Sequence, residues 1–296
     1  EIYDTIRFWT MSVRDYLEEY FESDVVKAHL AGSAIIGTAL GPYSPGSAYV
    51  LLHHYMGEVD GTVGAWGYAR GGMGSITQAM SKSFETSGGE IKAGSPVSNI
   101  LIKNNRSYGL VLENGDEIYA NKIVSNLDVK RTFLKVVEEK QLPEDFYQAV
   151  KNFKIRGSSG KLNIALDDLP LWKSIPEGDP AGTGDLHITQ SIEEMERAYD
   201  DWKDGKWSSY PYVDMCIPSI NDPTMAPQGK HYMSVFIQYV PYNLANGGWT
   251  EDKRLEFGKH VMGRIGNYST NFNDIIKHAE IRTPKELEAE VGLTEG

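Results

Sequence analysis

The residues best suited to chemistry lie in the glycine-rich segment 57–74, which holds seven glycines. Trp66, Tyr68 and Arg70 alternate near its end, in a predicted strand, so all three side chains are expected on one face. Two aromatic rings and a guanidinium can line an amphipathic cavity and orient the polar end of a substrate. The alternative is an ordinary core strand whose arginine reaches solvent.

A second candidate is the Gly71–Gly74 turn that precedes a predicted helix. Helix N-termini attract phosphate, so this turn can be interpreted as an anion cradle. It is neither a G-x-G-x-x-G fingerprint nor a P-loop, because Thr77 stands at the sixth position from Gly72 and no Gly-Lys-Ser or Gly-Lys-Thr follows. The alternative is a tight turn where the helix packs closely on a strand.

Other catalytic classes find little support in the sequence. His53 and His54 can orient a substrate, activate oxygen or serve a structural role. In an extended chain these neighbours point apart, and no cysteine or carboxylate cluster accompanies them, so we expect no metal site. There is no G-x-S-x-G elbow, and Cys216, the only cysteine, is expected to pack in a strand. We therefore assign no catalytic residue.

Charge and hydropathy exclude several classes of partner. With 29 Lys and Arg against 41 Asp and Glu among 296 residues, the net charge is 29 − 41 = −12, and no basic run exists to hold a nucleic acid. The longest apolar stretches fall far short of the roughly 18 residues that a membrane span needs. A single cysteine favours a reducing compartment, the cytoplasm or, in a eukaryote, the mitochondrial matrix.

The elements that must position these residues predict an α+β fold. Ser12 and Ser23 begin helices, Ser75 to Gln78 forms a capping box for a third, and Gly88-Gly89 ends that helix. An antiparallel meander follows, with predicted strands at residues 90–92, 97–103, 108–113 and 117–124. Asn114-Gly115 is predicted to join two of them in a type I′ turn, which requires positive φ at both residues.

The rest of the chain mixes strands with capped helices. Apolar residues alternate and predict half-buried strands at 162–166, 213–217 and 233–239. Helices are predicted after Ser191, near Thr250 and at Thr283-Pro284. We expect a mixed, largely antiparallel sheet with packed helices.

The order of these motifs resembles that of the phytoene-desaturase-like, FAD-dependent oxidoreductases. The motifs are Tyr68-Ala69-Arg70-Gly71-Gly72-Met73-Gly74, the following helix, Gly88-Gly89-Glu90-Ile91, Val97-Ser98-Asn99-Ile100, the Asn114-Gly115 hairpin and Val124-Ser125-Asn126-Leu127-Asp128. Further segments most resemble the pyridine nucleotide-disulfide oxidoreductase domain-containing protein type 2 branch: Ser12 to Glu22, Pro45 to Gly74, Cys216 to Gly229 and Gln238 to Leu244. The ordered set spans nearly the whole chain.

That resemblance implies a flavoprotein with a dinucleotide-binding half and a substrate half. The family's G-x-G-x-x-G fingerprint and its closing glycine-rich flavin segment are absent from this sequence. We therefore expect an internal fragment whose partner is the missing flavin-binding domain, and which alone is inactive and holds no FAD. Its expected parts are a helical part of the substrate domain (1–64), a strand, helix and meander linking to the flavin domain (65–128), the substrate-domain sheet and helices (129–280), and a return segment (281–296).

The resemblance also implies residues for the site. Val97 is expected to contact the adenine of FAD through its backbone, and Ser125 and Asn126 to lie in a strand that re-enters the cofactor domain. The 66–70 strand is expected to line a cavity for a small apolar, polyisoprenoid-like substrate that is oxidised by hydride transfer to flavin. Apolar surface near Val97 and Val124 is expected to favour self-association into a homo-oligomer. The alternative function is a non-catalytic binding or scaffold protein on the same fold.

Overall fold

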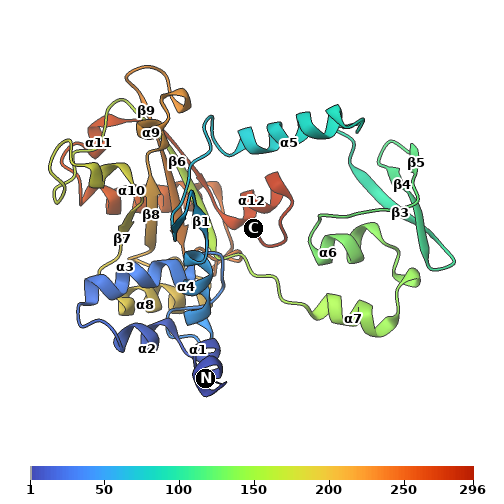
Figure 1. Ribbon diagram of the computed structural model, residues 1–296, viewed down its shortest axis with the longest axis horizontal. Coiled ribbons are helices and arrows are strands. Elements are labelled where there is room, and N and C mark those ends of the chain that lie inside the picture. Colours follow the sequence, from blue (N-terminus) through green and yellow to red (C-terminus); the bar gives the residue numbers. More distant parts are fainter. Residues whose placement is uncertain (1) are drawn as a thin grey trace. The chain divides into compact units, whose positions relative to one another are not determined.

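The computed structural model describes residues 2–296 and divides the chain into two compact units (Figure 1). Unit 1 comprises residues 2–76, 157–286 and 296, and unit 2 comprises residues 77–156 and 287–295. Helices and antiparallel sheets occur together, which confirms the predicted α+β class. Within residues 2–296, no helix is long and apolar enough to cross a membrane.

Unit 1 is built on a five-stranded sheet in the order β10-β6-β9-β8-β7, in which every neighbouring pair is antiparallel. The strands are β6 (Ser159–Leu166), β7 (Leu186–Ile188), β8 (Tyr212–Cys216), β9 (His231–Gln238) and β10 (Ile276–Arg282). The three alternating stretches of the sequence form β6, β8 and β9, as predicted. Strands β7 and β10 form the two edges of the sheet.

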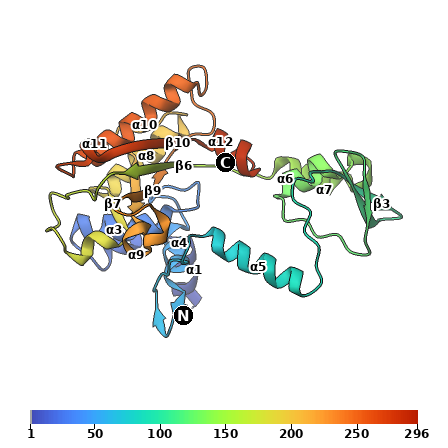
Figure 2. The same cartoon turned by 90° about the horizontal axis from the view of Figure 1, so that it is seen from above.

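One face of this sheet carries the main apolar core of unit 1. Leu162, Val235 and Met215 are direct cross-strand partners and are almost completely buried. They belong to one core with residues of helices α10 (Glu251–Gly266) and α11 (Phe272–Ile275), and Figure 2 shows α10 on one side of the sheet and α3 on the other. The predicted start of α10 is confirmed, because the Thr250 hydroxyl accepts a hydrogen bond from the Lys253 amide (3.3 Å).

Helices make up most of residues 2–55, as predicted for this part of the chain, and they pack on the opposite face of the sheet. The helices are α1 (Ile2–Thr10), α2 (Val13–Glu18), α3 (Asp24–Ile35) and α4 (Ser47–Tyr55). Ser12 caps α2 by accepting from the Asp15 amide (3.0 Å). A second core joins α2 to α4 with α8 (Ile192–Lys203) and with Tyr212 at the start of β8. Helix α8 begins after Ser191, whose hydroxyl accepts from the Glu194 amide, as predicted.

The glycine-rich segment does not form the predicted strand at residues 66–70. A two-residue hairpin, β1 (Glu58–Val59) with β2 (Thr62–Val63), precedes an irregular, unpaired stretch that ends in a turn at Arg70. Alternating residue types form a strand only where a neighbouring strand offers hydrogen bonds, and no strand pairs with residues 66–70. The remaining short elements of unit 1 are η3 (Pro180–Thr183), α9 (Pro218–Asn221) and η4 (Pro223–Met225).

Unit 2 contains a three-stranded antiparallel meander and short helices. The strands are β3 (Val97–Lys103), β4 (Arg106–Leu112) and β5 (Glu117–Tyr119), and the helices are α6 (Val129–Arg131), a π-helical turn (Thr132–Val136), η2 (Glu139–Gln141) and α7 (Glu144–Asn152). Helices α5 (Gly74–Thr86) and α12 (Pro284–Val291) each begin in unit 1 and end in unit 2. The predicted cap of α12 is confirmed, because the Thr283 amide donates to Glu286 Oε2 (2.8 Å).

Several local predictions in this region are wrong. Residues 90–92 form no strand, and β5 stops at Tyr119 instead of continuing to residue 124. The hairpin between β4 and β5 forms, but only Gly115 has a positive φ (90°), so the turn is not type I′; the Asn114 side chain instead accepts from the Asp116 amide. Ser75 lies inside α5 and donates to the Gly72 carbonyl oxygen, so it does not form the predicted capping box.

Candidate functional site

The second face of the five-stranded sheet is polar. Side chains of directly paired residues share a face, so the register defines two rows across the strands. One row runs Arg282, Lys161, Phe236, Asp214 and His187, and the next runs Glu280, Asn163, Ser234 and Cys216. We call these nine residues the polar face. Ionisable groups therefore lie together on the face of the sheet that the main core does not cover.

Lys161 stands near the centre of the polar face. Its ammonium donates to Ser234 Oγ, and among residues 2–296 no carboxylate forms an ion pair with it. Burial lowers the pKa of Lys161, and the nearby Cys216 and Asp214 only partly oppose that effect. A partly desolvated ammonium without a carboxylate partner keeps donors available for an electron-rich ligand.

Two histidines and a carboxylate lie at one edge of the polar face. His187 Nε2 is 3.3 Å from Asp214 Oδ2, and the His29 ring of α3 stacks on the His187 ring with centroids 5.0 Å apart. Burial lowers the pKa of His29, and the neighbouring His187 lowers it further. Within the described chain, His187 Nδ1 and the hydroxyl of the buried Tyr212 have no hydrogen-bond partner. Buried polar atoms in this state are suited to hold water or a ligand atom.

Tyr68 is the predicted site residue that reaches the polar face. Its hydroxyl donates to Asp185 Oδ1 (2.8 Å), and it interacts with Cys216 at the end of β8. Burial, with the Asp185 carboxylate, raises the pKa of Tyr68, and burial likewise raises the pKa of the Cys216 thiol. Both groups are therefore neutral at physiological pH. Half of the tyrosine side chain remains exposed, so its ring is accessible.

The other predicted substrate residues lie elsewhere on unit 1. Trp66 is 68% exposed and stacks on the His54 ring at 6.1 Å, and His53 is an exposed neighbour. Arg70 is exposed, and its charge lowers the pKa of Asp222 less than the Gly71 amide does. The structure therefore does not bring Arg70, His53 and Tyr68 into one contacting group.

The Gly71–Gly74 turn binds a carboxylate of this same chain. The Gly71 amide donates to Asp222 Oδ2 (2.5 Å), while Asp222 Oδ1 accepts from Thr224. Gly71 and Gly72 adopt φ values of 82° and 83°, a conformation that glycine tolerates. The turn interpretation therefore accounts for these glycines, and the amide that an external anion would need is already engaged.

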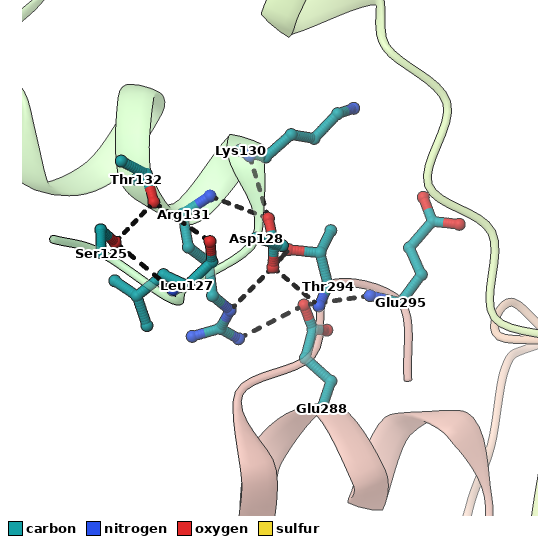
Figure 3. A network of polar contacts seen from close by, with 9 residues as sticks. All are labelled: Ser125, Leu127, Asp128, Lys130, Arg131, Thr132, Glu288, Thr294 and Glu295. Carbon is teal, nitrogen blue, oxygen red and sulfur yellow. Dashed lines mark hydrogen bonds and ion pairs between the residues drawn. The ribbon is translucent and has the colours of Figure 1, made fainter.

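The three predicted cofactor residues line one cavity in unit 2. Val97, Ser125 and Asn126 share a cavity of about 680 Å³ with Ile100, Leu110, Val124, Arg131 and Lys135, among others. Val97 lies on β3, and the other two lie in the irregular stretch after β5. Ser125 is fixed there, since its hydroxyl is 2.9 Å from Thr132 Oγ1 and accepts from the Leu127 amide (Figure 3).

Asp128, a carboxylate next to this cavity that was not among the predicted site residues, organises unit 2. Asp128 Oδ1 accepts from the Lys130 and Arg131 amides (2.9 and 3.0 Å), and Oδ2 accepts from the Thr294 amide and hydroxyl (3.2 and 2.7 Å), as Figure 3 shows. Arg131 adds an ion pair to Glu288 (3.6 Å). The local sequence indicated only that an aspartate before a helix is a favourable N-cap. The contact with Thr294 has no local signal, because Thr294 lies 166 residues away.

Comparison with known proteins gives one consistent result. No family model matches the chain. Over 287 residues it is 36% identical to pyridine nucleotide-disulfide oxidoreductase domain-containing protein 2 of Mus musculus, a match that covers 94% of this chain and 49% of the relative. Over 191 residues it is 28% identical to the chloroplastic prolycopene isomerase of Daucus carota, covering 63% of this chain and 28% of that protein.

Solved structures agree on the fold. A crystal structure of an oxidoreductase from Methanosarcina mazei superposes with a TM-score of 0.61 at 18% identity, over 92% of this chain and 56% of that one. The chain spans about half the length of the first two curated relatives, 49% and 51%. The resemblance identified from the motifs is confirmed: the chain is related to the phytoene-desaturase-like, FAD-dependent oxidoreductases.

Proposed function

We propose that the chain is the substrate-binding part of an FAD-dependent oxidoreductase that oxidises an apolar substrate by hydride transfer to flavin. The observation that carries this proposal is the shared cavity of Val97, Ser125 and Asn126, the three positions that the resemblance implies for FAD contact. They come from two separate segments of the chain, so their convergence is not a consequence of sequence proximity.

The chemistry of this cavity suits the adenosine part of FAD. Val97, Ile100 and Leu110 offer apolar walls for an aromatic ring, and Ser125 and Asn126 offer polar groups for its edges. Arg131 and Lys135 add positive charge near the same cavity, which suits a phosphate. We therefore assign Val97, Ser125 and Asn126 to cofactor binding. We assign them no step of the reaction.

The polar face supplies the groups that handle substrate. When bound, FAD supplies a hydride acceptor. Lys161 is suited to bind an electron-rich atom while Ser234 holds its ammonium in place. Tyr68, fixed by Asp185, presents a neutral aromatic ring that excludes water and packs on an apolar substrate. Trp66 and His54 extend the aromatic surface of unit 1.

Titration with FAD tests the cofactor assignment on this chain. The 296-residue chain lacks the G-x-G-x-x-G cradle, so we expect it to purify colourless and to retain no flavin after desalting, because an adenosine contact alone cannot offset the cost of association. At millimolar FAD or ADP, however, amide signals of Val97, Ser125 and Asn126 should shift in a ¹⁵N NMR spectrum. Shifts confined to other residues would overturn the cofactor assignment. Tight stoichiometric flavin binding would contradict the need for the cradle.

Flavin reduction in a longer protein that carries both this sequence and a dinucleotide-binding fingerprint tests the activity. Anaerobic addition of an apolar substrate such as a polyisoprenoid should bleach the flavin absorbance near its visible maximum. Stable flavin binding with no bleaching by any substrate of this class would favour the alternative, a binding or scaffold protein on the same fold.

A further inference from the structure

A cavity of about 640 Å³ lies in unit 1 between helix α9 and the segment 168–183, which connects β6 to β7. Its floor is apolar. Ile217 is 3% exposed and belongs to the main core, and Leu169, Trp172 and Ile220 pack against that core. The cavity is therefore on the core side of the five-stranded sheet, opposite the polar face.

Hydrogen bonds from two asparagines hold the walls of this cavity. The Asn271 side chain donates to the Leu169 carbonyl oxygen (3.0 Å) and accepts from the Leu171 amide (2.7 Å). Near the other end of the segment, the Asn221 side chain donates to the Thr183 carbonyl oxygen (3.1 Å). The connecting segment is thus fixed on both sides of the cavity before a ligand binds, which lowers the entropic cost of binding.

The charged residues that line the cavity are all acidic. Asp168, Glu177 and Asp179 line it and are exposed, and among residues 2–296 no lysine, arginine or histidine shares that lining. The neighbouring Asp167 pairs with Lys230 (2.8 Å), whereas none of the three lining carboxylates has an ion-pair partner in the part of the chain that the structure describes. Three uncompensated carboxylates around one cavity attract a cation and repel an anion.

The arrangement of these groups favours an organic cation over a metal ion. Within the described residues 2–296, no group of three histidine, cysteine, aspartate or glutamate side chains could hold a metal ion. The indole of Trp172 offers a ring face, which attracts ammonium groups. Ile217 and Ile220 offer hydrocarbon surface, and a cavity of this volume accommodates a ligand with an apolar body.

We propose that this cavity binds a small organic cation, an amine or quaternary ammonium group carried on an apolar body. The floor binds the body, while Trp172 and the three carboxylates bind the cationic group. The site goes beyond the proposed oxidoreductase, because it needs no flavin and no residue of the polar face. It binds its ligand in the 296-residue chain alone.

Three ligands with one naphthalene body and different charges test the ligand class. In isothermal titration calorimetry at neutral pH, 1-naphthylmethylamine should bind at least fivefold more tightly than the uncharged 1-naphthalenemethanol, and 1-naphthaleneacetate should bind more weakly than either. Salt screens attraction between exposed charges, so 0.5 M NaCl should reduce the advantage of the amine over the alcohol. Equal affinity for amine and alcohol, or tighter binding of the carboxylate, would overturn the proposal.

A cavity-filling variant tests the location. A Cβ on Gly182 would lie 4.0 Å from both Ile175 and Trp172, so Gly182→Leu places a side chain among the lining residues and should weaken amine binding at least fivefold. The matched control is Gly184→Leu, because Gly184 does not line the cavity and a Cβ there would meet no atom within 4 Å. The control should bind the amine within twofold of the unmodified chain.

Charge variants separate loss of the site from loss of folding. Each exposed carboxylate should contribute roughly twofold to amine affinity. Asp168→Asn combined with Glu177→Gln should therefore weaken amine binding roughly fourfold, with alcohol binding and the circular dichroism spectrum unchanged. Glu256→Gln, which removes an exposed carboxylate of α10 outside the cavity, should leave both affinities unchanged. Equal amine binding by all variants would overturn the proposal, and so would tighter binding of Ca²⁺ or of a lysine-rich peptide than of the amine.

Discussion

Replacing Asp128 by alanine perturbs the network of Figure 3 at its centre. The carboxylate is 17% exposed and accepts hydrogen bonds from two α6 amides and from the amide and hydroxyl of Thr294. Loss of an N-cap costs about 1 kcal/mol, and each of the two bonds to Thr294 contributes roughly 1 kcal/mol. We therefore expect the free energy of local unfolding in unit 2 to fall by about 3 kcal/mol.

Hydrogen exchange measures this loss where it should occur. A decrease of about 3 kcal/mol corresponds to a roughly 100-fold faster exchange of the Thr294 amide, because each 1.4 kcal/mol is tenfold. Amides of β6 and β9 in unit 1 should exchange as before. The matched control is Asp145→Ala, an exposed carboxylate in the first turn of α7. Unchanged protection of Thr294, or an equal loss in the control, would refute the role given to Asp128.

The same carboxylate gives stability a pH dependence of definite sign. Burial raises the pKa of Asp128, but hydrogen bonds from the Arg131 amide, from Thr294 and from the Lys130 amide outweigh it, so the pKa lies below the usual 3.8. Because the pKa of Asp128 is lower in the folded state, its carboxylate stabilises the fold fully above the unfolded-state pKa. This stabilisation is lost as the pH falls through the folded-state pKa. The protection factor of Thr294 should therefore drop below about pH 4, and Asp128→Asn should remove that drop.

Three further substitutions probe unit 1. In a longer flavin-containing form of the protein, Tyr68→Ala should change the kinetics of substrate oxidation with flavin content unchanged; loss of folding without a separable kinetic effect would instead make Tyr68 a core residue. Lys161→Met should raise the urea midpoint, because it removes a partly buried ammonium that lacks a carboxylate partner, and a lower midpoint would contradict that account. Gly72→Ala should destabilise unit 1 by about 1–2 kcal/mol, since φ is 83° and a Cβ would lie 3.1 Å from Met225; an unchanged melting temperature would argue against strain in this turn.

Local signals predicted the capped helices and the central strands. Caps such as Ser12, Ser191 and Thr250 act within three residues, so the sequence contains the whole interaction. Apolar and polar residues alternate in β6, β8 and β9 because one face of each strand packs on the main core, and this alternation is visible in the sequence. Convergence of Val97 with Ser125 was expected only through family resemblance, because no pattern in the residues specified it.

The missed features depend on pairing between distant residues. Alternation at Trp66 and Tyr68 indicated a strand, but strands need a partner, and the sequence does not state which segment lies alongside. The polar face becomes visible only when the register places Lys161 opposite Phe236 and Asp214 opposite His187. The bond from Thr294 to Asp128 spans 166 residues, beyond the reach of any local motif.

The division of the chain has a consequence for dissecting this protein. Unit 2 is assembled from residues 77–156 and 287–295, so its two pieces are separated in the sequence by most of unit 1. One proteolytic nick between residues 156 and 157 would give two products, and because each unit contains segments of both, the contacts within the units would hold the products together. Deleting residues 77–156 would instead strip the last segment of its hydrogen-bonding partner Asp128. Expressing unit 2 by itself therefore calls for a chain in which 287–295 is fused to 77–156 through a new linker.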